Sequence, residues 1–186
     1  MEIYPRLLDH PFYQAWMRGD VSWETLAAYH RSYAQLVRRI PFYWQAVVSA
    51  FEPNAGFHSP VVQEERDHVH LWERWGKRFS STGSYPDMSS VLDALDAMTP
   101  SQLLGAIQAF EVQQPEVART KKEGLLAHYG FTNEDLGYFD EHAKEDAHIE
   151  YGRSLAQRFA DPRDYHEGFE RGAQQFFNML DAFRLH

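Results

Sequence analysis

The sequence predicts an all-α protein, with seven helical segments packed as a single domain over residues 1–186. Apolar residues recur at three- and four-residue intervals, which is the spacing of one face of an α-helix. Proline, glycine and short polar clusters interrupt this pattern at the places where helices should end. No stretch of the chain reads convincingly as a β-strand. The content of 44% hydrophobic and 15% aromatic residues supports a packed core.

The first three segments are separated by short turns. The first runs over His10–Arg18 and ends at a Gly-Asp pair. The second begins after Ser22, a residue type that accepts hydrogen bonds from the first N–H groups of a helix, and extends to about Phe51. Pro41 should kink this helix, because proline lacks the backbone N–H that the helix would use. The third segment covers Val61–Phe79.

The last four segments begin with a short helix over Met88–Ala97. The fifth opens at Thr99-Pro100, the signature of a capping residue followed by proline at the first helical position, and runs to about His128. Pro115 cannot donate to the carbonyl four residues earlier, so we expect a kink there. The remaining two segments are Thr132–Ala160 and a helix that Pro162 opens.

Composition excludes several classes of function. The formal net charge of −9 makes a nucleic-acid partner improbable on electrostatic grounds. No apolar run reaches the roughly 18 residues of a membrane span, and the first residues lack a signal-peptide pattern. The chain has no cysteine, which excludes disulfides and thiol chemistry. We therefore expect a cytoplasmic protein whose substrate is a small molecule or derives from the protein itself. The chain could also form a homodimer.

The third segment carries a glutamate and a histidine that share a helical face. Glu65 and His68 are three residues apart, on the face that also holds the inward-pointing Trp72 and Trp75. Glu64, four residues before His68, is the competing candidate. Taken alone, the pattern is also that of an ordinary solvated charged face.

Two further clusters lie on the fifth and sixth segments. Glu111 stands in mid-helix among apolar residues, where a buried carboxylate must be neutralised, paired or bound to a metal. On the sixth segment, His142 and Asp146 share one face, and Glu145 and His148 share a neighbouring one. A hydrogen bond to a tyrosine or arginine would also explain Glu111, and a solvated face would explain the acidic cluster.

The combination of the three clusters favours a metal site. Helical bundles build two-metal carboxylate centres from Glu-x-x-His pairs together with a glutamate from another helix. Carboxylate oxygens with imidazole nitrogens suit iron or manganese, and the absence of thiolates disfavours structural zinc. The alternative is an interaction protein whose Glu and His clusters are structural.

The chain also resembles a known family. HPFYQAW near the start, EE..H..LW, FE..QPEVA..K..GLL..YG and YF.EH...D.H occur in order between residues 9 and 160. They are similar to the haem-oxygenase-like oxidases, and most of all to the CADD-like group, named for a chlamydial protein associating with death domains. That group is implicated in making 4-aminobenzoate for folate.

The resemblance implies a seven-helix haem-oxygenase-like bundle that binds two metal ions, Fe/Fe or Fe/Mn, with O2 as co-substrate. The ligands it implies are a glutamate from the Glu64-Glu65 pair and His68, Glu111, His142, Asp146 and His148. The chain departs from the family at two points. The family's glutamate precedes its histidine by seven residues, but here the gap is four or three. The family's last histidine would stand at Ile149, one residue after His148, which leaves Glu145 and Asp146 as alternative ligands.

In that family a tyrosine of the protein is thought to supply the aromatic ring and a lysine the amino group. The matching residues here are Tyr13 and Lys121, and Tyr29 and Tyr138 also match family tyrosines. On residue chemistry alone, Tyr13 and Tyr29 could equally be packed core residues and Lys121 a solvated one.

Related branches of the family weigh less. The TenA-type thiaminases use a cysteine nucleophile, which this chain lacks. The pyrroloquinoline-quinone-forming oxidase binds its anionic substrate through many Arg and His side chains, which an acidic chain fits poorly. We therefore expect a di-metal oxidase that makes 4-aminobenzoate from its own residues. The alternative is an oxidase acting on a separate small amino acid or fatty acid.

Overall fold

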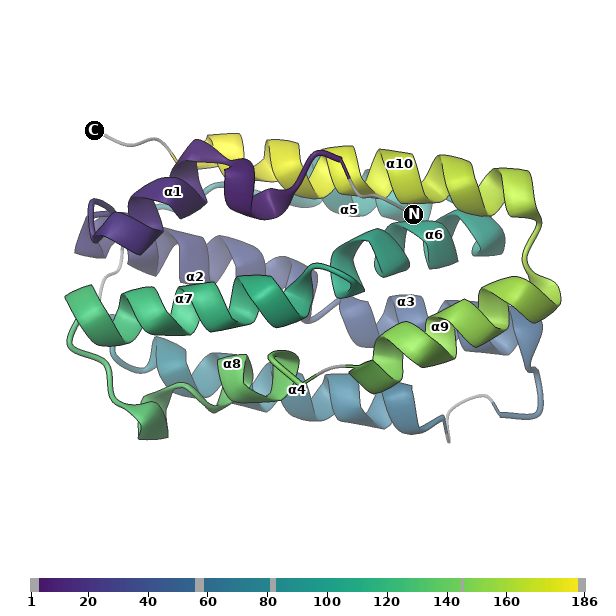
Figure 1. The fold of residues 1–186 in the computed structure, drawn as a ribbon, viewed down its shortest axis with the longest axis horizontal. Helices are drawn as coiled ribbons and strands as arrows, with labels where there is room; N and C mark the ends of the chain where they lie inside the picture. The colour runs from purple at the N-terminus through teal and green to yellow at the C-terminus, as the bar shows by residue number, and fades with distance from the viewer. Residues whose placement is uncertain (1–3, 56–58, 81–82, 145, 184–186) are drawn as a thin grey trace.

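A computed structural model describes residues 4–55, 59–80, 83–144 and 146–183, and all the regular secondary structure in these ranges is helical (Figure 1). The all-α prediction is therefore confirmed. The α-helices of the described residues are α1 (Pro11–Arg18), α2 (Trp23–Val37), α3 (Ile40–Phe51), α4 (Pro60–Gly76), α5 (Ser89–Asp96), α6 (Pro100–Glu111), α7 (Gln114–His128), α8 (Gly137–His142), α9 (Asp146–Phe159) and α10 (Pro162–Asn178). Short 3₁₀ turns cover Leu7–Asp9, Asn133–Asp135 and Met179–Ala182.

Three of the seven predicted segments are each divided into two helices. The second is divided into α2 and α3 and the fifth into α6 and α7. In both cases the proline that predicted a kink, Pro41 or Pro115, lies in the first turn of the second helix. Proline is tolerated there because the first turn has no intrahelical acceptor for its missing N–H. The sixth segment is divided into α8 and α9, where the sequence contains no proline.

The predicted helix starts have the expected caps. The Ser22 side chain accepts a hydrogen bond from the backbone N–H of Thr25 at the start of α2. Thr99 and Gln102 form a reciprocal capping box at the start of α6, which satisfies two otherwise unpaired N–H groups.

Most of the long helices run along the long axis of the molecule, with α10 on one side, α4 and α8 on the other, and α9 running obliquely between them (Figure 1). Helix α6 packs against α10, α3 and α9, and α4 packs against α3 and α8. The four helices α4, α6, α8 and α9 therefore meet in the interior. Trp72 and Trp75 of α4 are fully buried, as the apolar face of this helix predicted.

Glycines allow α6 and α10 to approach closely. A Cβ added at Gly168 of α10 would overlap the backbone carbonyl of Gln102, and one at Gly105 of α6 would overlap that of Tyr165. Because backbone atoms cannot move aside as a side-chain end can, only glycine fits at this crossing. The close contact fixes α6, the helix that ends at Glu111.

Among the described residues, no helix combines the length and apolar character needed to cross a membrane.

Candidate metal centre

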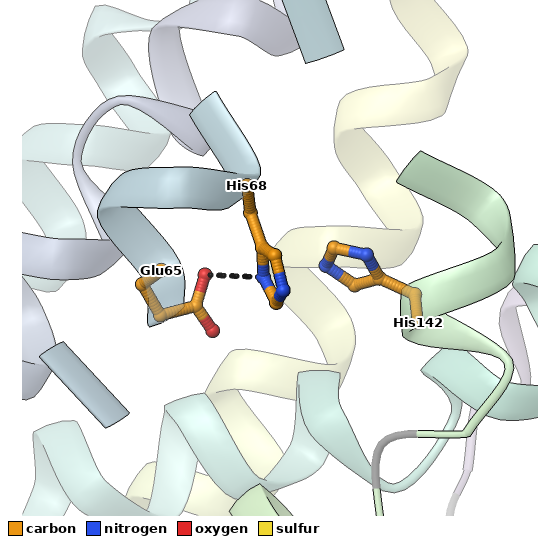
Figure 2. Close-up of side chains that lie close together, drawn as sticks. All are labelled: Glu65, His68 and His142. Atoms are coloured by element: carbon orange, nitrogen blue, oxygen red, sulfur yellow. Dashed lines mark ion pairs between the residues drawn. The ribbon is translucent and has the colours of Figure 1, made fainter. Parts of the chain in front are cut away.

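Two overlapping groups of buried Glu and His side chains lie where these four helices meet. Glu65 and His68 of α4 and His142 of α8 form the first, with potential ligand atoms all within 4.8 Å of one another. Figure 2 shows the His142 ring pointing from α8 toward the α4 pair. Glu65 joins Glu111 of α6 and His148 of α9 in the second group, within the same limit. Glu65 is common to both, which is the position a carboxylate needs to serve two neighbouring ions.

The five side chains are all buried, so their charges must be balanced inside the protein. The Glu65 carboxylate lies 3.4 Å from His68 Nδ1 and 3.2 Å from His148 Nδ1. Burial alone would raise the pKa of Glu65, but its hydrogen bonds to the His148 and His68 rings outweigh this and hold the pKa below its usual value. Glu65 is therefore an anion at neutral pH.

Neighbouring groups orient the ligand candidates. Trp44 of α3 donates its indole N–H to Glu111 Oε1 at 3.2 Å. His142 Nδ1 lies 2.8 Å from the Tyr138 carbonyl oxygen. Because a carbonyl can only accept, His142 Nδ1 carries the proton, and the lone pair that a metal requires is on Nε2. Tyr138 also stacks its ring on that of His142, with centroids 4.0 Å apart.

The break between α6 and α7 sets the position of Glu111. Glu111 is the last residue of α6, and Val112 and Gln113 separate it from α7. The Gln113 side chain accepts a hydrogen bond from the Leu7 N–H at 2.7 Å and donates one to the Ala109 carbonyl at 3.0 Å. These bonds hold the chain at the break and keep Glu111 directed into the bundle.

The other predicted ligands occupy different environments. Glu64 is exposed over 57% of its side chain, whereas Glu65 faces the interior, as the apolar face predicted. Asp146, the first residue of α9, is exposed and belongs to neither group. Its role as a ligand stays a prediction, and Glu145 lies outside the described residues.

Two of the three predicted tyrosines, Tyr13 and Tyr29, form a second buried cluster with Lys121, whereas Tyr138 lies beside His142. Lys121 Nζ lies 2.7 Å from the Tyr29 hydroxyl, which is 3.0 Å from the Tyr13 hydroxyl. The ammonium position also lies over the rings of Tyr13, Tyr29 and Tyr33, 4.8 to 5.2 Å from their centroids. Burial lowers the pKa of Lys121 to about 7. The alternative reading of Lys121 as a solvated residue is wrong, because its side chain is enclosed by aromatic rings.

Sequence reasoning missed two contributors to these clusters. Trp44 donates a hydrogen bond to Glu111 and the Tyr33 ring covers Lys121, but neither residue belongs to a motif that the sequence analysis singles out. Their helical periodicity placed them inside, but no spacing along one helix shows which polar group a partner on another helix will contact.

The donor set is one that could hold metal ions. It contains two carboxylates and three imidazoles, all buried, with one carboxylate shared by the two groups. Hard oxygen donors combined with imidazole nitrogens are common ligands of divalent transition metals.

Comparison with known proteins gives a consistent result. Residues 62–182 match the family model described as iron-containing redox enzymes. A 4-aminobenzoate synthase of Chlamydia muridarum is 26% identical over 95% of this chain and 84% of its own length. The enzyme of the same name from Chlamydia trachomatis is 26% identical over 95% of this chain and 86% of its own. A third, from Nitrosomonas europaea, is 27% identical over 83% and 74%.

Proposed function

The chain belongs to the family of iron-containing redox enzymes, and on that premise we propose that it is a two-metal oxidase that makes 4-aminobenzoate from its own side chains. Relatives that carry the name 4-aminobenzoate synthase align over most of the chain. At about 26% identity, these relatives support the assignment of this chain as an oxidoreductase. The particular reaction comes to this chain by analogy with them. The case for the reaction therefore rests on the residues of this chain.

In this proposal Glu65, His68, Glu111, His142 and His148 would hold two irons, or one iron and one manganese, and the metals when bound would supply the activation of O2. Glu65 contributes its charge to both positions. Tyr138 fixes the tautomer and the orientation of His142 through its backbone carbonyl. The surrounding helices bury all five side chains.

The observation that carries the proposal is the buried contact between Lys121 and two tyrosines. An amine can attack a carbon atom only when its nitrogen is neutral. Because burial lowers the pKa of Lys121 to about 7, a substantial fraction of its amine is neutral at neutral pH, whereas a solvated lysine is almost wholly protonated. The nitrogen lies 2.7 Å from the Tyr29 hydroxyl, at the ring position that carries nitrogen in 4-aminobenzoate.

Tyr13 and Tyr29 are the candidates for the source of the ring. Both phenols stay protonated at neutral pH, because burial raises their pKa values. Tyr13 is the first candidate, since it lies in the HPFYQAW motif and its ring centroid is 4.8 Å from the lysine nitrogen. Tyr29 is the second, since its hydroxyl contacts both Tyr13 and Lys121.

The test supplies purified protein with Fe(II), with or without Mn(II), a reductant and O2, and adds no organic substrate. We expect less than one 4-aminobenzoate per chain, together with altered masses at Tyr13 and Lys121. Tyr13→Phe should release none. Tyr43→Phe, a buried tyrosine of α3 outside the cluster, should behave as the unmodified protein.

Many turnovers on an added small molecule, with Tyr13 and Lys121 intact, would refute this reading. The conventional oxidase acting on a separate substrate would then take its place with the same metal ligands. A protein that binds no metal would support an interaction module instead.

A further inference from the structure

A cavity of about 480 Å³ opens between the start of α4 and the start of α9, directly beside the second group of ligand candidates. Val61, Ala147 and the Tyr151 ring provide apolar wall, and Glu52, Glu64 and His148 provide polar wall. His148 therefore faces two environments. It lines this cavity and also belongs to the buried group with Glu65 and Glu111.

The His148 ring bridges an outer and an inner carboxylate. Its Nε2 atom lies 2.8 Å from Glu64 Oε2, and its Nδ1 atom lies 3.2 Å from Glu65 Oε1. The Glu64 side chain is 57% exposed, whereas those of His148 and Glu65 are 4% and 5% exposed. The three side chains thus form a continuous series of potential metal ligands from solvent to the interior.

The charge on the cavity wall favours a cation. The residues described as lining it include two glutamates and neither lysine nor arginine. Glu52 already accepts hydrogen bonds from Arg158 at 3.0 Å and from the Tyr151 hydroxyl at 2.8 Å. Glu64 is therefore the carboxylate that an entering cation meets, and its partner on the inner side is a ring that can itself bind metal.

We propose that this cavity is the entrance through which divalent metal ions reach the buried centre, with Glu64 as the first ligand and His148 as the second. The inference rests on the two-metal centre of the proposed function. Glu64 acts on the rate of loading, because a carboxylate at the mouth raises the local concentration of cations. It leaves the final metal content unchanged, because Glu65 and not Glu64 lies in the buried groups.

The test follows Mn(II) uptake by the full-length protein after removal of its metals with a chelator. Tryptophan fluorescence gives the time course, since Trp44 contacts Glu111, and metal analysis gives the end point. We expect Glu64→Gln to load about tenfold more slowly at low ionic strength, as the loss of one charge a few ångströms from a divalent ion implies, and to reach the same end point. In about 0.5 M salt the difference should shrink, because exposed charges are screened.

Glu73→Gln is the matched control, because Glu73 is also an exposed, ion-paired glutamate of α4 and lies outside the cavity. Glu73→Gln should take up Mn(II) at the rate of the unmodified protein.

A second pair of variants tests the route by changing the width of the cavity. Ala147→Phe should narrow the cavity and slow loading several-fold, whereas Ala46→Phe, at an exposed alanine of α3 lining a different hollow, should not.

Unchanged loading in Glu64→Gln at low ionic strength, or in Ala147→Phe, would overturn the entrance. A Glu64→Gln protein that loads at the normal rate to a lower end point would make Glu64 a permanent ligand, which also overturns it. In these cases the two-metal centre stands. Unmodified protein that takes up no Mn(II) and no Fe(II) would refute the proposed function together with its entrance.

Discussion

Lys121 gives the sharpest prediction about stability, because a buried lysine links folding to pH. Burial lowers its pKa from 10.5 in the unfolded chain to about 7 in the folded protein. Between these values the unfolded chain binds one more proton at this residue than the folded protein does. The free energy of unfolding should therefore rise with pH across this window. Below about pH 7 both states are protonated and the contribution is constant.

The size of the effect follows from the shift. A difference of about 3.5 pKa units corresponds to roughly 5 kcal/mol of stability that is present above pH 10.5 and lost as the pH falls to 7. Over the accessible range from pH 7.5 to 9.5 the expected change is roughly 2–3 kcal/mol. Lys121→Met keeps a side chain of similar length without the charge, so its stability should lack this dependence.

The assay is denaturant unfolding of both proteins at several pH values in this range, followed by tryptophan fluorescence and circular dichroism. The unfolding free energy of the natural protein minus that of Lys121→Met should increase by roughly 2–3 kcal/mol from pH 7.5 to 9.5. Other titrating groups are the same in both proteins and cancel in the difference. A difference that stays constant would show that Lys121 is solvated, and the argument for a neutral amine would fail.

Three further predictions concern the ligands and the helix packing. Glu111→Ala should still fold, because it removes a buried charge, and should lose metal, because it removes a ligand. Full metal content in this variant would refute the role of Glu111. Glu65→Ala should lose metal and Glu64→Ala should keep it at equilibrium, and the opposite result would make Glu64 the ligand. Gly168→Ala should lower the free energy of unfolding by about 1–3 kcal/mol, because its Cβ overlaps a backbone carbonyl of α6, whereas Gly137→Ala meets only ordinary contacts. Equal stability of the two glycine variants, measured by urea unfolding, would contradict the close packing of α6 and α10.

The seven predicted segments correspond in order to the helices of the structure, because periodicity and capping are local properties. The prolines also gave the positions of two breaks, at α2–α3 and at α6–α7. The break between α8 and α9 was not predicted, since no proline or glycine marks it. It falls within the acidic segment where the sequence departs from its family.

The candidate site was predictable where a single helix decided the outcome. The apolar face of α4 placed Glu65 inside and Glu64 outside. Contacts between side chains of different helices could not be predicted from the sequence. The exposure of Asp146, the contact of Trp44 with Glu111 and the bridging position of His148 depend on how four helices meet. Spacing along one helix carries no information about such contacts.

Isotopic labelling decides whether the protein itself supplies the product's atoms, because it identifies their source. The protein would be produced with tyrosine labelled by ¹³C in the ring and lysine labelled by ¹⁵N at Nζ. After purification it would receive unlabelled Fe(II), Mn(II), reductant and O2. We predict 4-aminobenzoate carrying six ¹³C ring atoms and one ¹⁵N, at less than one molecule per chain. Unlabelled 4-aminobenzoate, or none from protein that holds two metal ions, would contradict the account.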